Sequence, residues 1–269
     1  MSENIEDNGK SREDQVREFD QQLANNGVNI HNFPSRFMFG ADLGEDWVNL
    51  ILPDVYEILN DPASIDYTEN LAAKIDYGLQ VGVLPRQYTK PFLYLKDVIH
   101  HLSTAYVNKY LLSVWGGSVK FEGTVDINDM WIVKQLADDY NPVHDHSTIS
   151  PCGLSGVVYI KSPPQILDVE EDRTSSQNSR GQIKLWAGPP TATQQPNSFH
   201  PPSVIQIRPK PGQLILFPKD TPHGVDPFKG DGDRICIAFN VNIWYHNNVD
   251  TTTALINDLK RQIAELKNK

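Results

Sequence analysis

The stretch NPVHDHSTISPCGLSGVVYI, residues 141–160, places a carboxylate between two imidazoles directly before an apolar segment rich in β-forming residues. If residues 144–146 are extended, His144 and His146 share one face of the chain and Asp145 takes the other. Two imidazoles on one face can bind a transition metal when further ligands come from elsewhere. A pair of neighbouring histidines at a strand end is more often a surface or hydrogen-bonded feature, so the pair alone does not establish a site.

A third ligand is available in PGQLILFPKDTPHGVDPF, residues 211–228. His223 follows a β-type run and a turn bounded by prolines, an arrangement that suits a metal site at the mouth of a barrel. With His144 and His146 it would form a triad of three neutral imidazoles.

A competing arrangement keeps Asp145 as a ligand. Asn141 and Pro142 could mark a loop in which the chain has already turned, so that the carboxylate of Asp145 swings inward in place of His146. We favour His146, which keeps the i, i+2 spacing of a strand. We expect Asp145 to act instead as an outer acceptor that orients a ring nitrogen or a backbone group.

The run RICIAFNVNI, residues 234–243, has two contrasting faces. One face is apolar throughout and the other is small or polar, so the second face leaves room for a ligand. Arg234 begins the run eleven residues after His223, and a guanidinium at the end of such a strand is suited to binding a carboxylate at the floor of a cavity. The simpler alternative is a surface arginine at a strand start. The apolar face comprises Ile235, Ile237, Phe239, Val241 and Ile243, and the other comprises Arg234, Cys236, Ala238, Asn240 and Asn242.

These residues must be positioned by a β-domain. Short β-type runs separated by Gly, Pro, Asn and Asp fill residues 118–248, which predicts a sandwich or barrel. Residues 29–117 contain apolar residues at three- and four-residue steps, as in NLAAKIDYGLQ (residues 70–80), and predict a helical layer that supports the core. Two polar, proline-rich stretches, residues 162–181 and 187–202, are expected to be long loops that act as lids or are merely insertions.

The two ends of the chain differ from each other. Residues 1–28 are polar and charged, which suits a solvated tail or a fraying helix better than a core element, and we expect disorder there. Residues 249–269 predict an amphipathic C-terminal helix, with one apolar face formed by Leu255, Leu259, Ile263 and Leu266. Its apolar seam could dock on the sheet, which we favour, or form a homodimer.

Composition limits the function classes. The chain has 269 residues and a formal net charge of −10, which argues against broad nucleic-acid binding. Cys152 and Cys236 provide neither a disulfide framework nor a zinc-site spacing. No apolar run approaches the roughly 18 residues of a membrane span. The expectation is a cytoplasmic protein without membrane partners.

The order of these motifs resembles the 2-oxoglutarate- and Fe(II)-dependent oxygenases, and in particular a branch found in marine bacteria and their phages. The resemblance is carried by the His-x-His pair, LSGVVYI, GQIKLWAGP and the run from Pro209 to Ile243, and it covers about residues 128–244. It implies a mainly β fold, a double-stranded β-helix or jelly roll, with N-terminal helices and a C-terminal helix. For a phage protein the location would be the host cytoplasm.

The resemblance also implies roles for single residues. His144 and His223 would bind iron, Arg234 would bind the distal carboxylate of 2-oxoglutarate, and Tyr159 would donate its hydroxyl to the same carboxylate. The implied activity is a dioxygenase (hydroxylase) that uses Fe(II), 2-oxoglutarate and O2, converts 2-oxoglutarate to succinate and hydroxylates a protein side chain or a small molecule. The family pattern is His-x-Asp followed by a distant histidine, and this sequence departs from it at His146.

A second class of function shares the architecture. The His-x-His pair and FPKDTPH also resemble cupin signatures, which would make the chain a cupin-like metal protein or a non-catalytic binding module. Against this reading, no glutamate follows His146 at the cupin spacing, and Arg234 would have no role.

Overall fold

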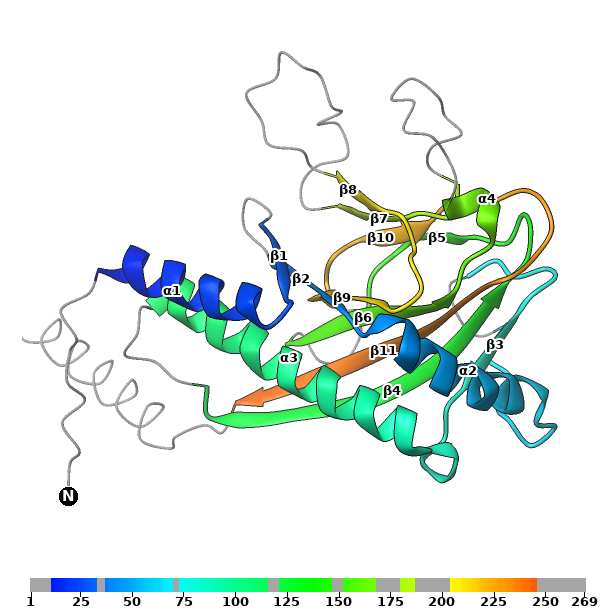
Figure 1. The fold of residues 1–269 in the computed structure, drawn as a ribbon, viewed down its shortest axis with the longest axis horizontal. Helices are drawn as coiled ribbons and strands as arrows, with labels where there is room; N and C mark the ends of the chain where they lie inside the picture. The colour runs from blue at the N-terminus through cyan, green and yellow to red at the C-terminus, as the bar shows by residue number, and fades with distance from the viewer. Residues whose placement is uncertain are drawn as a thin grey trace, which may run out of the picture.

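The fold is that of a computed structural model, which describes residues 11–32, 37–69, 73–115, 121–146, 152–167, 180–186 and 204–245. Its centre is a pair of antiparallel sheets with helices packed against one of them (Figure 1). No helix within these ranges is long and apolar enough to cross a membrane.

Eight consecutive strands form a jelly roll. In this topology the chain is an antiparallel hairpin rolled up on itself, so the first strand pairs with the last and each inner strand with its counterpart. The pairs here are β4 with β11, β5 with β10, β6 with β9 and β7 with β8. The expected jelly roll is therefore present. The strands are β4 (Gly123–Gln135), β5 (Asn141–His144), β6 (Gly153–Lys161), β7 (Ile183–Trp186), β8 (Val204–Ile207), β9 (Gln213–Pro218), β10 (His223–Val225) and β11 (Arg234–Tyr245).

The eight strands divide between two sheets. The larger sheet has the order β1-β2-β9-β6-β11-β4-β3 and the smaller has the order β5-β10-β7-β8. Two apolar clusters hold this arrangement together: one lies between the larger sheet and the helices, and the other includes residues of both sheets, such as Val157 and Leu185.

Strand β11 shows how the sequence pattern determines the packing. Its odd-numbered apolar residues are at most 4% exposed and belong to the cluster that faces the helices. Its even-numbered residues line a cavity on the opposite face of the larger sheet. The predicted division of this strand into a core face and a cavity face is confirmed.

The segment before the jelly roll is not purely helical. It contains the helices α2 (Gly44–Asn60) and α3 (Lys90–Trp115), a short 3-10 turn η1 (Pro85–Gln87), and three strands that extend the larger sheet. These strands are β1 (Asn29–Asn32), β2 (Phe37–Asp42) and β3 (Leu79–Gly82). The helical-layer prediction for residues 29–117 missed them because runs of four to six residues show too little periodicity to identify a strand.

The helical expectation for residues 70–80 was wrong over the described part, residues 73–80. This segment has a backbone bridge from Lys74 to Tyr140 and then enters β3. The buried carboxylate of Asp139 accepts hydrogen bonds from the backbone N–H groups of Asp76 and Tyr77, at 2.8 and 3.2 Å. Tertiary contacts with the turn after β4 thus override the local helical spacing.

The N-terminal segment also differs from the expected disordered tail. Residues 12–25 form α1 (Arg12–Asn25), capped by the Ser11 side chain and packed along α3. Leu23 is buried, and Asp20 forms an ion pair with the buried Lys109 of α3. The sequence signal was weak because few large apolar residues anchor the helix. The expected C-terminal helix at residues 249–269 and most of both proline-rich loops lie outside the described residues, so those expectations stay predictions.

Candidate metal centre

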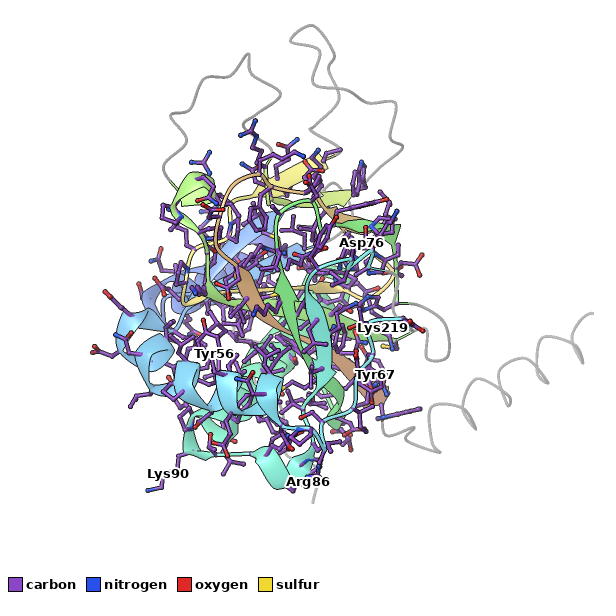
Figure 2. The ribbon with its side chains drawn as sticks, turned by 90° about the vertical axis from the view of Figure 1, so that its right-hand side faces the viewer. Tyr56, Tyr67, Asp76, Arg86, Lys90 and Lys219 are labelled. Atoms are coloured by element: carbon purple, nitrogen blue, oxygen red, sulfur yellow. The ribbon has the colours of Figure 1, made fainter. Side chains whose placement is uncertain are left out.

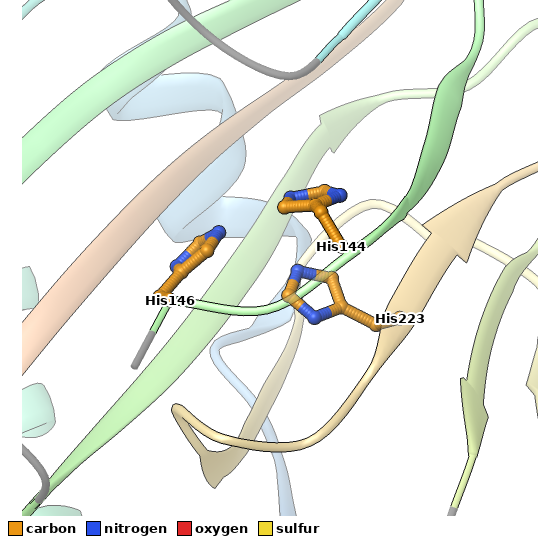
Figure 3. A group of neighbouring side chains, drawn as sticks. All are labelled: His144, His146 and His223. Carbon is orange, nitrogen blue, oxygen red and sulfur yellow. The ribbon is translucent and has the colours of Figure 1, made fainter. Parts of the chain in front are cut away.

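Three histidine side chains converge at one end of the jelly roll (Figure 3). His144 ends β5, His223 begins β10, and the two lie opposite each other in the antiparallel pair. His146 follows two residues after the strand, where its backbone N–H donates to the carbonyl of Lys219 at 2.8 Å. The ring centroids are separated by 4.4 Å (His144 to His223), 4.9 Å (His146 to His223) and 5.1 Å (His144 to His146).

One nitrogen atom from each of the three rings lies within 4.8 Å of the others. Among the described residues, this is the group of His, Cys, Asp or Glu side chains whose ligand atoms lie close enough together to bind one metal ion. The carboxylate of Asp145 is not part of this group, and Asp145 is exposed. The structure thus brings His146, rather than Asp145, together with the other two histidines.

Hydrogen bonds set the orientation of each ring. Nδ1 of His144 lies 2.7 Å from the carbonyl oxygen of Pro142, and Nδ1 of His223 lies 2.9 Å from that of Thr221. A carbonyl can only accept, so both Nδ1 atoms carry the proton and both Nε2 atoms keep a lone pair. These are the tautomers that a metal bound through Nε2 requires.

The ring of His146 is held by side chains of two neighbouring strands. Its Nδ1 lies 2.7 Å from Oδ1 of Asn240 on β11 and 2.9 Å from Oγ of Ser155 on β6. Oγ of Ser155 also donates to Oδ1 of Asn240, at 2.6 Å. The amide oxygen therefore accepts from both groups and orients the third imidazole. Sequence analysis missed this role for Asn240, although it had placed the residue on the cavity face.

Burial keeps the imidazoles of His146 and His223 neutral. Loss of hydration, together with the nearby rings of His144 and His146, lowers the pKa of His223 to about 3. Burial also lowers the pKa of His146. Neutral imidazole is the form that binds a metal, so the site does not have to release protons from these two rings near pH 7.

The second part of the site lies at the start of β11. Arg234 is 2% exposed, and its Nη1 donates to Oε1 of the buried Gln135 on the paired strand β4. The guanidinium carbon lies 5.3 Å from the ring centroid of Tyr159 on β6. The alternative of a surface arginine is thus excluded, and Gln135 is a contact that the sequence pattern did not reveal.

One atom of this guanidinium and one beside it lack partners among the described residues. Nε of Arg234 and the hydroxyl of Tyr159 are buried, and neither has a hydrogen-bond partner in the part of the chain that the structure describes. Burial raises the pKa of Tyr159 to about 12, so its hydroxyl remains a donor. Buried donors without partners are rare and costly, and here both lie near one positive charge. Together they provide the donors that an anion would need.

One cavity of about 1140 Å³ connects these parts. Its lining includes the three histidines, Arg234 and the even-numbered residues of β11, among them Cys236 and Ala238. Cys236 and Ala238 are the small residues expected to keep the cavity open. Tyr159 is not part of the lining, but its ring centroid lies 5.3 Å from the guanidinium carbon of Arg234. A candidate metal-binding group and a buried cationic group thus face a shared space.

Part of the chain that contains this site matches a known protein family. Residues 129–240 match a family model described as "Putative 2OG-Fe(II) oxygenase", and the match begins within β4 and ends within β11. This segment is therefore similar to the 2-oxoglutarate- and Fe(II)-dependent oxygenases. All three histidines, Tyr159 and Arg234 lie within it. A search of curated proteins found no match to the chain.

Solved structures similar to this chain include a prolyl hydroxylase from Trichoplax adhaerens in complex with a hypoxia inducible factor peptide fragment. It is 17% identical, with a TM-score of 0.49, and the alignment covers 87% of this chain and 90% of that chain. Another is HygX from Streptomyces hygroscopicus with nickel, 2-oxoglutarate and hygromycin B bound, at 14% identity and a TM-score of 0.45, covering 84% and 86%. A third is AviO1 from Streptomyces viridochromogenes, at 12% identity and a TM-score of 0.48, covering 86% and 95%.

Proposed function

We propose that His144, His146 and His223 hold Fe(II) in this 2-oxoglutarate-dependent dioxygenase, and that Arg234 binds the distal carboxylate of 2-oxoglutarate. The observation that carries the proposal is the shared cavity, in which three converging imidazoles and a buried guanidinium face the same space. The order of motifs along residues 128–244 also supports placing the chain in the branch known from marine bacteria and phages.

The donor set fits a divalent transition metal. Imidazole nitrogen is a suitable ligand for Fe(II), and three neutral ligands on one side of an ion leave the remaining positions open for a chelating co-substrate and dioxygen. The backbone carbonyls at Pro142 and Thr221 and the amide of Asn240 fix the three rings, so little reorganisation is needed on metal binding.

The anion site fits the second carboxylate of 2-oxoglutarate. Among the described residues, Nε of the buried Arg234 has no hydrogen-bond partner, and neither has the hydroxyl of Tyr159 beside it. A carboxylate placed there would satisfy both groups through charge-assisted hydrogen bonds. Gln135 would hold the guanidinium in position because its side-chain oxygen already accepts from Nη1.

The chemistry of the bound iron is the activation of O2, which couples decarboxylation of 2-oxoglutarate to succinate and CO2 with insertion of one oxygen atom into a C–H bond of a second substrate. The chain contributes the binding and the environment. Arg234 and Tyr159 orient the co-substrate, and the apolar residues Val157, Ile183 and Phe217 line the cavity and limit the access of water.

Two measurements test this proposal. Addition of Fe(II) and 2-oxoglutarate without oxygen should give the weak visible charge-transfer absorption of a chelated 2-oxo acid. Admission of oxygen, with no second substrate, should then release succinate slowly. If iron binds but neither absorption nor succinate appears, the dioxygenase assignment fails and a binding module becomes the better description.

A further inference from the structure

A second buried cation lines the same cavity, away from Arg234. Lys219 follows β9 and is 6% exposed. Its backbone N–H donates to the carbonyl of Gly153 at 3.1 Å, and its own carbonyl accepts from the N–H of His146. The aliphatic part of the side chain crosses Gly153, where an added Cβ would lie 2.6 Å from Cδ of Lys219. The lysine is therefore held in place next to the third histidine.

The ammonium group of Lys219 has an incomplete set of partners. Nζ donates to Oδ1 of Asn242 at 3.0 Å, and none of the ion pairs among the described residues includes it. Lysine is almost never this buried without a partner, because removing its charge from water is costly. Two acidic residues that line the cavity, Asp129 and Asp145, are both exposed. A bound anion would compensate the buried charge.

The position of Lys219 separates it from the co-substrate site. Along β11 the cavity face runs from Arg234 past Asn240, which contacts His146, to Asn242, which contacts Lys219. At about 3.3 Å per residue, Asn242 lies roughly 26 Å along the strand from Arg234. A five-carbon dicarboxylate bound at Arg234 cannot reach that far. The two cations therefore lie on opposite sides of the histidine group.

The cavity has room for a second molecule. Its volume of about 1140 Å³ exceeds the roughly 300–1,000 Å³ of common ligand pockets. The lining also includes aromatic side chains: the ring of Trp131 lies 6.0 Å from that of His146, and Tyr67 lies on the same side of the molecule as Lys219 (Figure 2). Aromatic surfaces in a cavity that also contains a buried cation suit a flat or apolar group that carries an acidic substituent.

We propose that Lys219 binds an anionic group, a carboxylate or a phosphate ester, of the second substrate of this dioxygenase. The inference rests on the proposed function, since it assigns Arg234 to 2-oxoglutarate and leaves Lys219 for the molecule that is oxidised. Asn242 and the backbone around Gly153 position the lysine, and the anion would lie close to the histidine group, where oxidation takes place.

The test uses protein loaded with Mn(II) and saturated with 2-oxoglutarate, so that the Arg234 end of the cavity is filled. Inorganic phosphate and acetate are titrated separately by calorimetry at constant ionic strength, and the tighter of the two identifies the type of anion. Lys219→Met removes the charge and keeps an unbranched side chain, and Lys219→Gln serves as a second variant. Lys96→Met is the matched control because Lys96 also lines the cavity, beside Tyr88.

The proposal predicts saturable binding of one anion per chain, weakened at least tenfold in both Lys219 variants and by less than twofold in Lys96→Met. Equal affinity in the wild type and the Lys219 variants, or no saturable binding in the wild type, overturns it. A tenfold loss of 2-oxoglutarate affinity in the Lys219 variants would also overturn it, by assigning the lysine to the co-substrate. If the wild type binds neither Mn(II) nor 2-oxoglutarate, the proposed function fails. Titration of the metal-free protein with phosphate and acetate then still measures whether Lys219 binds an anion.

Discussion

His223 lies directly across the β5–β10 pair from His144, so the hydrogen-bonded register of two short strands sets the spacing of two candidate iron ligands. The third, His146, depends on a different restraint, the hydrogen bond from its ring to Asn240 on the other sheet. The site is therefore built across the open edge between the two sheets, and each ligand can be tested by itself.

The identity of the third ligand is tested by comparing His146→Ala with Asp145→Ala. Because Asp145 is exposed and lies outside the group of converging ligand atoms, we expect Asp145→Ala to keep one iron per chain. His146→Ala should lose most of the bound iron. Iron content after desalting under anaerobic conditions measures both. Iron lost in the Asp145 variant and retained in the His146 variant would refute the three-histidine assignment.

Replacing Arg234 should weaken 2-oxoglutarate binding while leaving iron binding intact. Removal of one partner of a buried charge pair costs about 2 to 5 kcal/mol, so Arg234→Ala should reduce the affinity by more than tenfold. Calorimetric titration with 2-oxoglutarate measures the effect. Arg208→Ala, which removes an arginine outside the cavity lining, is the control. Unchanged affinity in Arg234→Ala would exclude this residue from the co-substrate site.

Tyr159→Phe separates a binding role from a packing role. The Tyr159 hydroxyl is buried and has no hydrogen-bond partner within the described ranges, so its removal should not lower the melting temperature of the ligand-free protein. The same change should weaken 2-oxoglutarate binding by about 1 kcal/mol if the hydroxyl donates to the carboxylate. Thermal unfolding with and without 2-oxoglutarate measures both effects. A variant that is destabilised without ligand and binds 2-oxoglutarate normally would show that the hydroxyl has only a structural role.

The pH dependence of stability follows from His223. Its folded-state pKa of about 3 lies below the ordinary value of 6.5, so protonation favours the unfolded chain. Its contribution to stability is therefore complete above about pH 6.5 and is lost as the pH falls from there toward 3. Urea unfolding of the metal-free protein at pH 7.5 and pH 5 should show a decrease on the order of 1 to 2 kcal/mol from this residue. His223→Asn should show a smaller decrease, and an equal decrease in the variant would contradict the assignment.

The sequence predicted the parts of the site that depend on strand alternation. The phase of β11 placed Arg234, Cys236 and Ala238 on the cavity face, and the spacing of His144 and His146 placed both rings together. The sequence could not predict contacts between distant strands, such as Gln135 with Arg234 or Ser155 with His146, because pairing register is a tertiary property. Lys219 was missed for a simpler reason: a lysine between proline and aspartate after a strand has the pattern of an exposed turn.

In the segment before the jelly roll, helical spacing predicted the structure less well than strand alternation did within the jelly roll. Residues 73–80 have apolar residues at helical steps, yet the buried Asp139 carboxylate and the bridge to Tyr140 hold them in an extended path. Strand β2 was missed because its apolar run is short, although its Phe39 is completely buried against α3. At both places the structure is determined by contacts within the assembled sheets, and the local spacing of apolar residues does not predict those contacts.

The register between His144 and His223 also determines when the site can form during synthesis. The two residues are about 80 positions apart in the chain, and their pairing closes one of the longest loops in the jelly roll. Contacts of such high sequence separation form late in folding. A chain still on the ribosome would present His144 and His146 long before His223 is available, so complete metal loading must wait until β10 has been made and has joined the smaller sheet.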